Sequence, residues 1–195
     1  MEGGSVEARK VMVVADPSRE SSGALQYALA HAIQDGDTLV LLHVENPGAW
    51  KNPFGALFKY PASPGRGGGQ ISSAAAEGER DVDFIDGMKR VCSAAKPKLK
   101  VEVEKAETAE GRDKASMILA HSEACKIDLL IIGQRRTTLS NSLLGPRRGL
   151  SLRGFDTADY VVENSQCKCV AVQKKGQNGG YLLNSKLHKN FWLLA

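Results

Sequence analysis

The chain has 195 residues, of which 42% are hydrophobic and 25% are charged, and its formal net charge at pH 7 is +4. These values are ordinary for a soluble globular domain that is long enough to bury a core. A net charge this small does not by itself indicate a nucleic-acid partner. No apolar run reaches membrane-spanning length and the N-terminus has no apolar signal region, so we expect a cytoplasmic protein, with the nucleus as a second location, and no membrane contact.

Strands and helices alternate along the chain. Five short apolar runs are typical of strands, at residues 11–15, 38–44, 99–103, 127–132 and 168–173. Segments with apolar residues at helical spacing lie between these runs, at residues 19–34, 77–96, 111–126 and 156–164. Residues 99–103 alternate apolar and charged side chains, which indicates a strand near a sheet edge. The run at 168–173 is expected to be the last strand.

This alternation predicts an α/β fold of Rossmann-like type. Parallel neighbours need long crossovers, so five strands joined by helices favour a single five-stranded parallel sheet sandwiched by helices. Ligands of such sheets bind beyond the carboxyl ends of the strands, where the strand order reverses. Asp16, Val44 and Gly133 each stand at the end of a predicted strand. We therefore expect these residues to lie near one crevice.

The segments outside the alternation of strands and helices indicate the boundaries of the domain and its loop insertions. Residues 1–9 are expected to form a flexible N-terminus, and residues 10–174 the α/β domain. Two loop insertions are expected within the domain, at 45–76, which is rich in Pro, Gly and Ser, and at 134–154. Residues 175–195 follow as a C-terminal tail.

Cysteines and histidines give no sign of a metal site. Cys92, Cys125, Cys167 and Cys169 each lie in or beside a predicted helix or strand, which favours reduced core thiols over a disulfide framework. No C-x-x-C motif occurs and the histidines are scattered, so we expect no bound metal. His43 lies within a buried strand and is interpreted as a packed core histidine.

Four segments of the chain read VMVVADPSRESSGALQYAL, TLVLLHV, DLLIIGQRR and TADYVVENSQCKCVAV, and together they cover roughly residues 10–173. In these segments and in their order the chain resembles the universal stress protein family, of the adenine-nucleotide alpha-hydrolase-like superfamily. The long loop and the tail are similar to those of a plant branch. The resemblance implies the strand order 3-2-1-4-5, a homodimer formed through the last strand, and a stress-response module that in some members binds ATP.

The resemblance also implies a ligand site. It places Asp16 and Val44 against the adenine and ribose, and a loop of pattern G-x2-G-x9-G-[ST] around the phosphates. Gly133 matches the first glycine, whereas Arg136 and Pro146 take the second and third positions, and proline has no N–H to donate. The phosphate loop is therefore degenerate.

Alignment from the other end of the loop gives the same result. Counting backwards from residues 159–162 puts Phe155 and Asp156 where Gly-Ser or Gly-Thr should stand. The carboxylate of Asp156 would repel a phosphate.

Five arginines and no acidic residue occupy the loop that follows Gly133. Two interpretations remain open. Guanidinium groups can replace backbone amides and hold the phosphate of ATP or another adenine nucleotide. Alternatively, this is a solvated basic loop that remains after nucleotide binding was lost, because exposed cationic loops are common. The arginines are Arg135, Arg136, Arg147, Arg148 and Arg153.

Asp16 also has a purely structural interpretation. A carboxylate at this position can accept a hydrogen bond from a ribose hydroxyl. Alternatively, it can cap the helix that follows, and Ser18 can fill that role as well. No G-x-S-x-G elbow, Walker lysine motif or G-x-G-x-x-G fingerprint occurs, so we expect no catalytic residue.

Partner contacts are expected at the tail. Leucines with Phe191 and Trp192 form an apolar group that either folds back onto the domain or its dimer mate, or docks a protein partner. The alternative to a nucleotide-binding module is a nucleotide-free dimeric scaffold that contacts other proteins through this tail. Nucleic acid is not expected, because the arginine loop lacks the interleaved aromatic residues that stack on bases.

Overall fold

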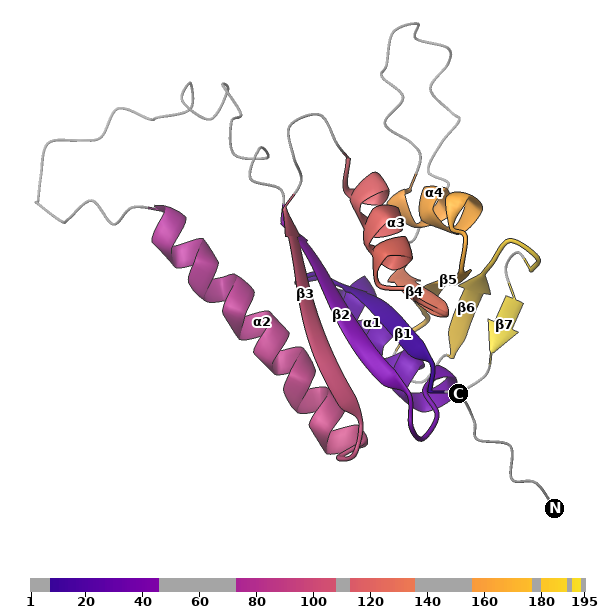
Figure 1. Ribbon diagram of the computed structural model, residues 1–195, viewed down its shortest axis with the longest axis horizontal. Helices are drawn as coiled ribbons and strands as arrows, with labels where there is room; N and C mark the ends of the chain where they lie inside the picture. The colour runs from indigo at the N-terminus through magenta and orange to yellow at the C-terminus, as the bar shows by residue number, and fades with distance from the viewer. Residues whose placement is uncertain are drawn as a thin grey trace, which may run out of the picture.

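The computed structural model describes residues 8–45, 73–107, 113–135, 156–176, 180–188 and 191–193 (Figure 1). The strands are β1 (Lys10–Ala15), β2 (Thr38–Glu45), β3 (Lys100–Glu107), β4 (Leu129–Gly133), β5 (Lys168–Lys174), β6 (Tyr181–Asn184) and β7 (Phe191–Leu193). The helices are α1 (Arg19–Tyr27), η1 (Ala28–Ala32), α2 (Ser73–Ala95), α3 (Lys114–Ala124) and α4 (Thr157–Asn164).

All the strands belong to one sheet, in the order β3-β2-β1-β4-β5-β6-β7. The predicted order 3-2-1-4-5 is confirmed for β1 to β5, which pair in parallel. The predicted position of β3 at a sheet edge is also confirmed. The prediction of only five strands is wrong, because β6 pairs antiparallel with β5 and β7 pairs antiparallel with β6.

The region expected as a tail therefore extends the sheet. Tyr181 of β6 is buried, and its ring packs edge-on against Tyr27, with the ring centroids 5.4 Å apart, and against His31, at 5.6 Å. Aromatic pairs at such separations stabilise a fold beyond the area they bury. The tail folds back onto its own domain, and β5 has neighbours on both sides.

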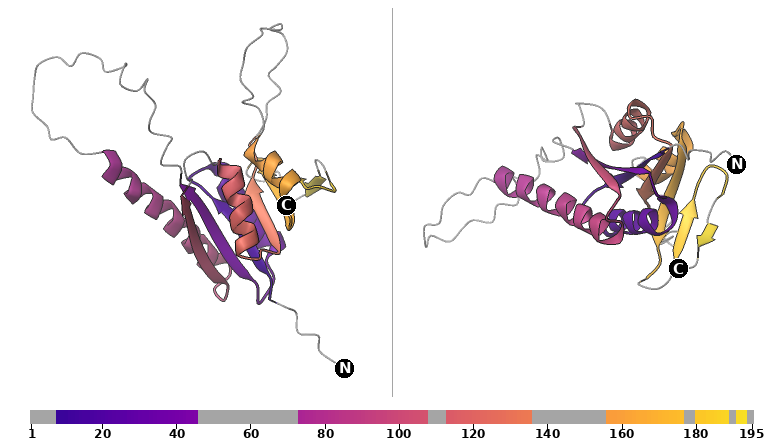
Figure 2. Two further views of the ribbon diagram at one scale, coloured as in Figure 1. Left: turned by 45° about the horizontal axis from the view of Figure 1, so that its top comes forward. Right: turned by 60° about the horizontal axis from the view of Figure 1, so that its bottom comes forward.

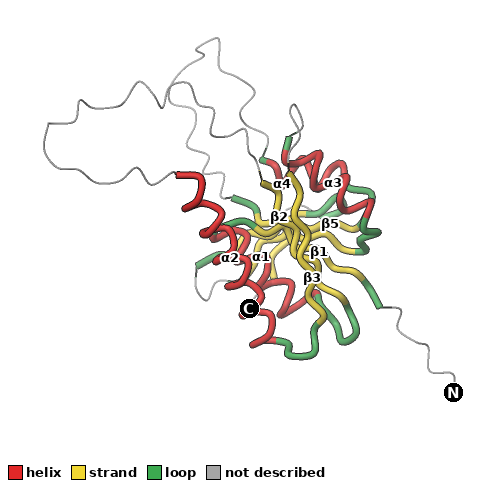
Figure 3. The backbone as a smooth tube through the Cα atoms, turned by 60° about the vertical axis from the view of Figure 1, so that its left-hand side comes forward, coloured by secondary structure: helices red, strands yellow, loops and turns green. Residues whose placement is uncertain are grey.

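Helices cover both faces of the sheet (Figures 2 and 3). The side chains of α1, η1 and α2 form one hydrophobic cluster with one face of the sheet, and those of α3 and α4 form a second cluster with the other face. β1, at the centre of the parallel strands, is buried on both faces from Val11 to Ala15. This explains why its sequence is continuously apolar.

Polar side chains cap the helices at the carboxyl edge of the sheet. Ser18 begins α1 and accepts a hydrogen bond from the N–H of Ser21, while Asp113 begins α3 and accepts one from Ser116. Asp156 begins α4. The predicted helix at 19–34 is split, because after Tyr27 the chain continues in the wider π-helical turn η1 and ends at Ala32.

Candidate functional site

The carboxyl ends of β1 and β4 lie side by side where the sheet order reverses. Ala15 is level with His43 of β2, which brings Asp16 level with Val44. On its other side β1 pairs with β4, which ends at Gly133. The strand ends predicted to share one edge of the sheet are therefore brought together, and this switch point is the candidate site.

Asp16 does not cap α1. The cap is Ser18, and Asp16 shapes the turn before it, since its Oδ1 accepts the N–H of Ser18 at 3.1 Å. The N–H of Asp16 donates to the hydroxyl of Ser21 at 3.1 Å, and that hydroxyl donates to the carbonyl of Val14 at 2.9 Å. These contacts fix the first turn of α1 against the end of β1 and leave the second oxygen of Asp16 for another partner.

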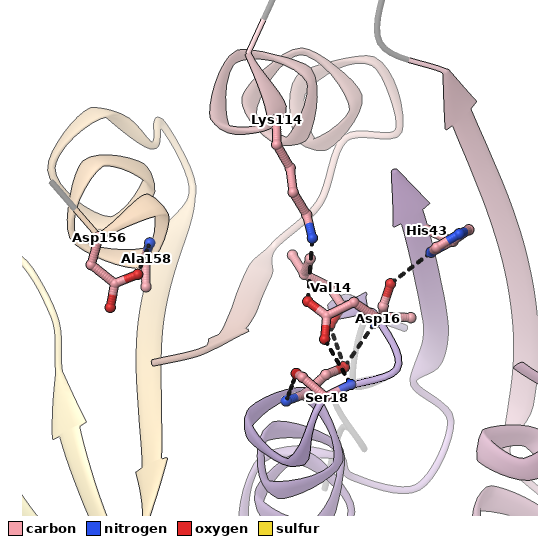
Figure 4. A network of polar contacts seen from close by, with 9 residues as sticks. Val14, Asp16, Ser18, His43, Lys114, Asp156 and Ala158 are labelled. Carbon is pink, nitrogen blue, oxygen red and sulfur yellow. Dashed lines mark hydrogen bonds and ion pairs between the residues drawn. The ribbon is translucent and has the colours of Figure 1, made fainter. Parts of the chain in front are cut away.

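That partner is Lys114, which the sequence analysis missed. The side chain of Lys114 extends from the first turn of α3 to Asp16, and its Nζ lies 3.2 Å from Oδ2 (Figure 4). The side chains of Lys114 and Asp16 are 34% and 30% exposed, so solvent reaches the pair. A carboxylate offers about four lone-pair sites, and the described contacts of Asp16 use two of them. Asp16 can therefore still accept hydrogen bonds from a ligand.

Val44 and His43 belong to the core. Val44 is 6% exposed, and its side chain packs in the hydrophobic cluster under α3. Its contact with an adenine nucleotide stays a prediction. His43 is buried, its Nδ1 is 3.0 Å from the carbonyl oxygen of Ala15, and its ring meets Phe84 edge-on. The interpretation of His43 as a packed core histidine is confirmed.

Gly133 is enclosed by the first turn of α1. A Cβ on Gly133 would lie 2.4 Å from the carbonyl carbon of Glu20 and 2.8 Å from the N of Ser21. Such contacts are far inside van der Waals distance, so only glycine permits this approach. The packing of α1 explains this glycine without any ligand.

Gln134 follows Gly133 and links three elements. Its side chain is buried, its Nε2 donates to Asp159 of α4 at 2.8 Å, and its Oε1 accepts from Nδ2 of Asn184 of β6 at 2.6 Å. Its backbone N–H donates to the carbonyl of Val172 in β5 at 2.9 Å. This residue, which the sequence analysis did not single out, fixes the end of β4 against α4 and the C-terminal strands.

The arginine loop lies largely outside the described residues. Arg135 is described and exposed. The predicted site residues Arg136, Arg147 and Arg148 fall in residues 136–155, outside the described part of the chain, and so does Arg153. Both interpretations of this loop stay open.

Asp156 lies where the chain re-enters the described fold. Its Oδ1 accepts the N–H of Ala158 at 3.3 Å, and its Oδ2 is buried without a hydrogen-bond partner among the described residues (Figure 4). Burial raises the pKa of this carboxyl, and the nearby Asp159 raises it further. The N–H of Ala158 and the N–H and charge of Arg135 act in the opposite direction but do not cancel the rise in pKa.

The switch point thus offers hydrogen-bond acceptors and charges.

Within the described ranges, no group of three or more His, Cys, Asp or Glu side chains is arranged to hold a metal ion. No helix of the described segments combines the length and the apolar character needed to span a membrane. The four cysteines are free thiols.

Comparison with known proteins identifies the family. Residues 7–173 match the family model described as the universal stress protein family. The chain belongs to the universal stress protein family. It is also 26% identical over 175 residues to Universal stress protein PHOS32 of Arabidopsis thaliana, a match that covers 88% of this chain and 67% of the relative.

Solved structures agree with this universal stress protein in fold. Hypothetical protein MJ0577 superposes with a TM-score of 0.56 at 18% identity, over 87% of this chain and 98% of that one. A universal stress protein family protein from Arabidopsis thaliana, solved with AMP bound, superposes with a TM-score of 0.52 at 15% identity, over 86% of this chain and 93% of that one. These similarities confirm the α/β fold.

Proposed function

We propose that this protein is a non-catalytic stress-response module that binds the adenosine part of an adenine nucleotide at the switch point between β1 and β4. Membership of the family supports the stress-response role. A similar structure that carries AMP supports the ligand class. The observation that carries the proposal is the position of Asp16, a partly exposed carboxylate at the end of β1.

Asp16 has the properties that ribose recognition requires. A carboxylate at a strand end in this kind of sheet accepts hydrogen bonds from ribose hydroxyls. Here the N–H of Ser18 orients one oxygen and Lys114 pairs with the other, so the carboxylate is held in one position before a ligand arrives. Pre-organisation of this kind lowers the entropic cost of binding.

Equilibrium dialysis with radiolabelled adenosine, AMP and ATP tests the proposal. Asp16→Asn keeps the size of the side chain but removes its charge, and we expect it to weaken binding by about 10- to 100-fold, since a hydrogen bond to a charged group contributes about 1.5–3 kcal/mol. Asp35→Asn, an exposed position at the opposite edge of the sheet, is the control and should bind like the wild type. The proposal fails if the wild type binds none of these ligands at millimolar concentration, or if Asp16→Asn changes nothing.

A second function, a nucleotide-free dimeric scaffold, is favoured by the surface of the C-terminal strands. Leu187 is 88% exposed, and Phe191 and Trp192 are each 52% exposed. Because β6 covers β5, we propose that a homodimer pairs through β7, where the sheet ends. Deleting the tail would remove core contacts of Tyr181, so a surface variant is the better test.

The double variant Leu187→Ser, Phe191→Ser provides that test. Sedimentation equilibrium should show a dimer for the wild type and a monomer for this variant, with unchanged circular dichroism. Val91→Ser, at an exposed apolar position on α2, serves as the control and should remain dimeric. A wild-type monomer at 100 μM or a dimeric double variant would contradict this second function.

A further inference from the structure

A charged acceptor and a charged donor lie side by side at the switch point. Oδ1 of Asp16, which follows β1, accepts the N–H of Ser18 at 3.1 Å, and Oδ2 lies 3.2 Å from Nζ of Lys114. Ser18 and Lys114 approach the carboxylate from opposite sides (Figure 4). Because β1, α1 and α3 each contribute one of these groups, the fold itself sets the position of the pair.

The backbone that carries Lys114 is fixed, while its ammonium group is accessible. Lys114 begins α3, and the helix is capped by Asp113, which accepts the N–H of Ser116 at 2.8 Å. Ala115 and Ile118 of the same helix are buried in the core cluster. The two side chains of the ion pair are 34% and 30% exposed. A ligand at the switch point can therefore reach both charged groups without any movement of α3.

The chemistry of the pair is complementary to a hydroxyl group. A carboxylate only accepts hydrogen bonds and an ammonium group only donates them, through three N–H groups. The described contacts of Lys114 use one of these donors, and those of Asp16 leave a lone pair on each oxygen. A hydroxyl can donate to the carboxylate and accept from the ammonium group at the same time. A C–H group in its place can do neither.

We propose that Lys114 is a specificity-determining residue: together with Asp16 it binds one sugar hydroxyl of the nucleoside, so that the site selects ribonucleosides over deoxyribonucleosides. The hydroxyl donates to Asp16 and accepts from Lys114. This inference rests on the proposed function and names the class of sugar that the same site takes. Sites built to hydrogen-bond a hydroxyl reject analogues that lack it, because the polar groups of the site then lose a partner.

Equilibrium dialysis of the full chain with adenosine, 2′-deoxyadenosine and 3′-deoxyadenosine tests the inference. The wild type should bind adenosine at least about tenfold more tightly than one of the two deoxy analogues, since a hydrogen bond to a charged group is worth at least that factor. Lys114→Met removes the donor and should reduce this ratio by at least about threefold. Lys114→Arg retains N–H donors and a positive charge, and should keep most of the ratio.

An amino analogue distinguishes hydroxyl selection from simple orientation of Asp16. At mildly acidic pH, adenosine with an ammonium group in place of the discriminating hydroxyl can donate to Asp16 but is repelled by Lys114. Lys114→Met should therefore bind this analogue more tightly than the wild type does, and adenosine more weakly. If Lys114 only orients Asp16, both affinities will fall together, and that result would overturn the inference.

Lys89→Met is the matched control. Lys89 also pairs with an aspartate, Asp86 at 3.5 Å, but this pair lies on the surface of α2. The substitution changes the net charge by the same amount and should leave all the affinities and their ratios unchanged. An equal change of the ratio in Lys89→Met would show a general effect of charge and overturn the assignment to Lys114.

The outcomes separate this inference from the proposed function. If the wild type binds adenosine and both deoxy analogues equally well, the inference fails and the proposed function stands. A ratio that Lys114→Met leaves unchanged would assign the hydroxyl to another residue, again without affecting the function. If the wild type binds none of these nucleosides at millimolar concentration, both fail.

Discussion

Gly133 faces the backbone of Glu20 so closely that a Cβ on the glycine would lie 2.4 Å from the Glu20 carbonyl carbon. The end of β4 and the first turn of α1 are therefore in direct backbone contact. The family resemblance implies a phosphate-binding role for this glycine, but its structural role is sufficient to explain it.

Substituting this glycine should be costly. We expect Gly133→Ala to lower the free energy of unfolding by about 1–3 kcal/mol, because a methyl group would force α1 away from β4. Gly87→Ala in α2 is the control, since nothing lies within 4 Å of the added Cβ and alanine favours a helix by up to about 1 kcal/mol. Urea denaturation measures both changes. Equal stability of Gly133→Ala and the wild type would contradict the close packing.

The pair of Lys114 and Asp16 should be measurably coupled. A double-mutant cycle with Lys114→Met and Asp16→Asn is expected to give a coupling of about 0.5–1 kcal/mol in unfolding free energy. The coupling should fall in 1 M NaCl, because solvent reaches the pair. The exposed pair of Lys89 and Asp86, at 3.5 Å on α2, is the comparison and should couple more weakly. The absence of coupling at low salt would show that Lys114 does not interact with Asp16.

Asp37 is expected to anchor the start of the sheet. Its carboxylate accepts the Nε, Nη2 and backbone N–H of Arg9 and the backbone N–H of Gln34. Asp37→Ala should lower the unfolding free energy by about 1–3 kcal/mol, because these donors lose their acceptor. Asp35→Ala, at an exposed neighbour, should stay within about 0.5 kcal/mol. Thermal or urea denaturation separates the two variants, and equal effects would contradict the anchor.

The same carboxylate should make stability depend on pH. Burial acts to raise the pKa of Asp37, but the hydrogen bonds from Arg9 and Gln34 outweigh it, and the net pKa is lowered in the fold. A lowered folded-state pKa contributes stability that is complete above the unfolded pKa of about 4 and is lost as the pH falls through the folded value. Between pH 5 and pH 2.5 the wild type should therefore lose more stability than Asp37→Asn. Parallel pH profiles would show that Asp37 does not contribute.

The C-terminal strands should contribute to stability through Tyr181. Tyr181→Ala is expected to cost about 2–4 kcal/mol, because its buried ring contacts Tyr27 and His31. Phe191→Ala on β7 is the matched control, since that ring is 52% exposed, and its cost should stay below about 1 kcal/mol. Chemical denaturation distinguishes them. Equal costs would indicate that β6 is only loosely attached.

Local patterns predicted most of the sheet because the first five strands are continuous or alternating apolar runs flanked by turn residues. The same patterns placed Asp16 and Gly133 at the switch point. β6 and β7 were missed because three or four residues carry too little periodicity to be told from a loop. Lys114 and Gln134 were missed because their partners lie 98 and 25 or 50 residues away, and no short window contains both members of such a pair.

The antiparallel hairpin that follows β5 has a consequence for handling this protein. A chain shortened after Lys174 would present an unpaired row of N–H and C=O groups along β5, whose central residues are apolar. Such rows act as templates on which other chains add strands and grow into fibrils. β6 and β7 thus protect the edge of β5 against aggregation, and solutions of shortened forms should become turbid where those of the whole chain stay clear.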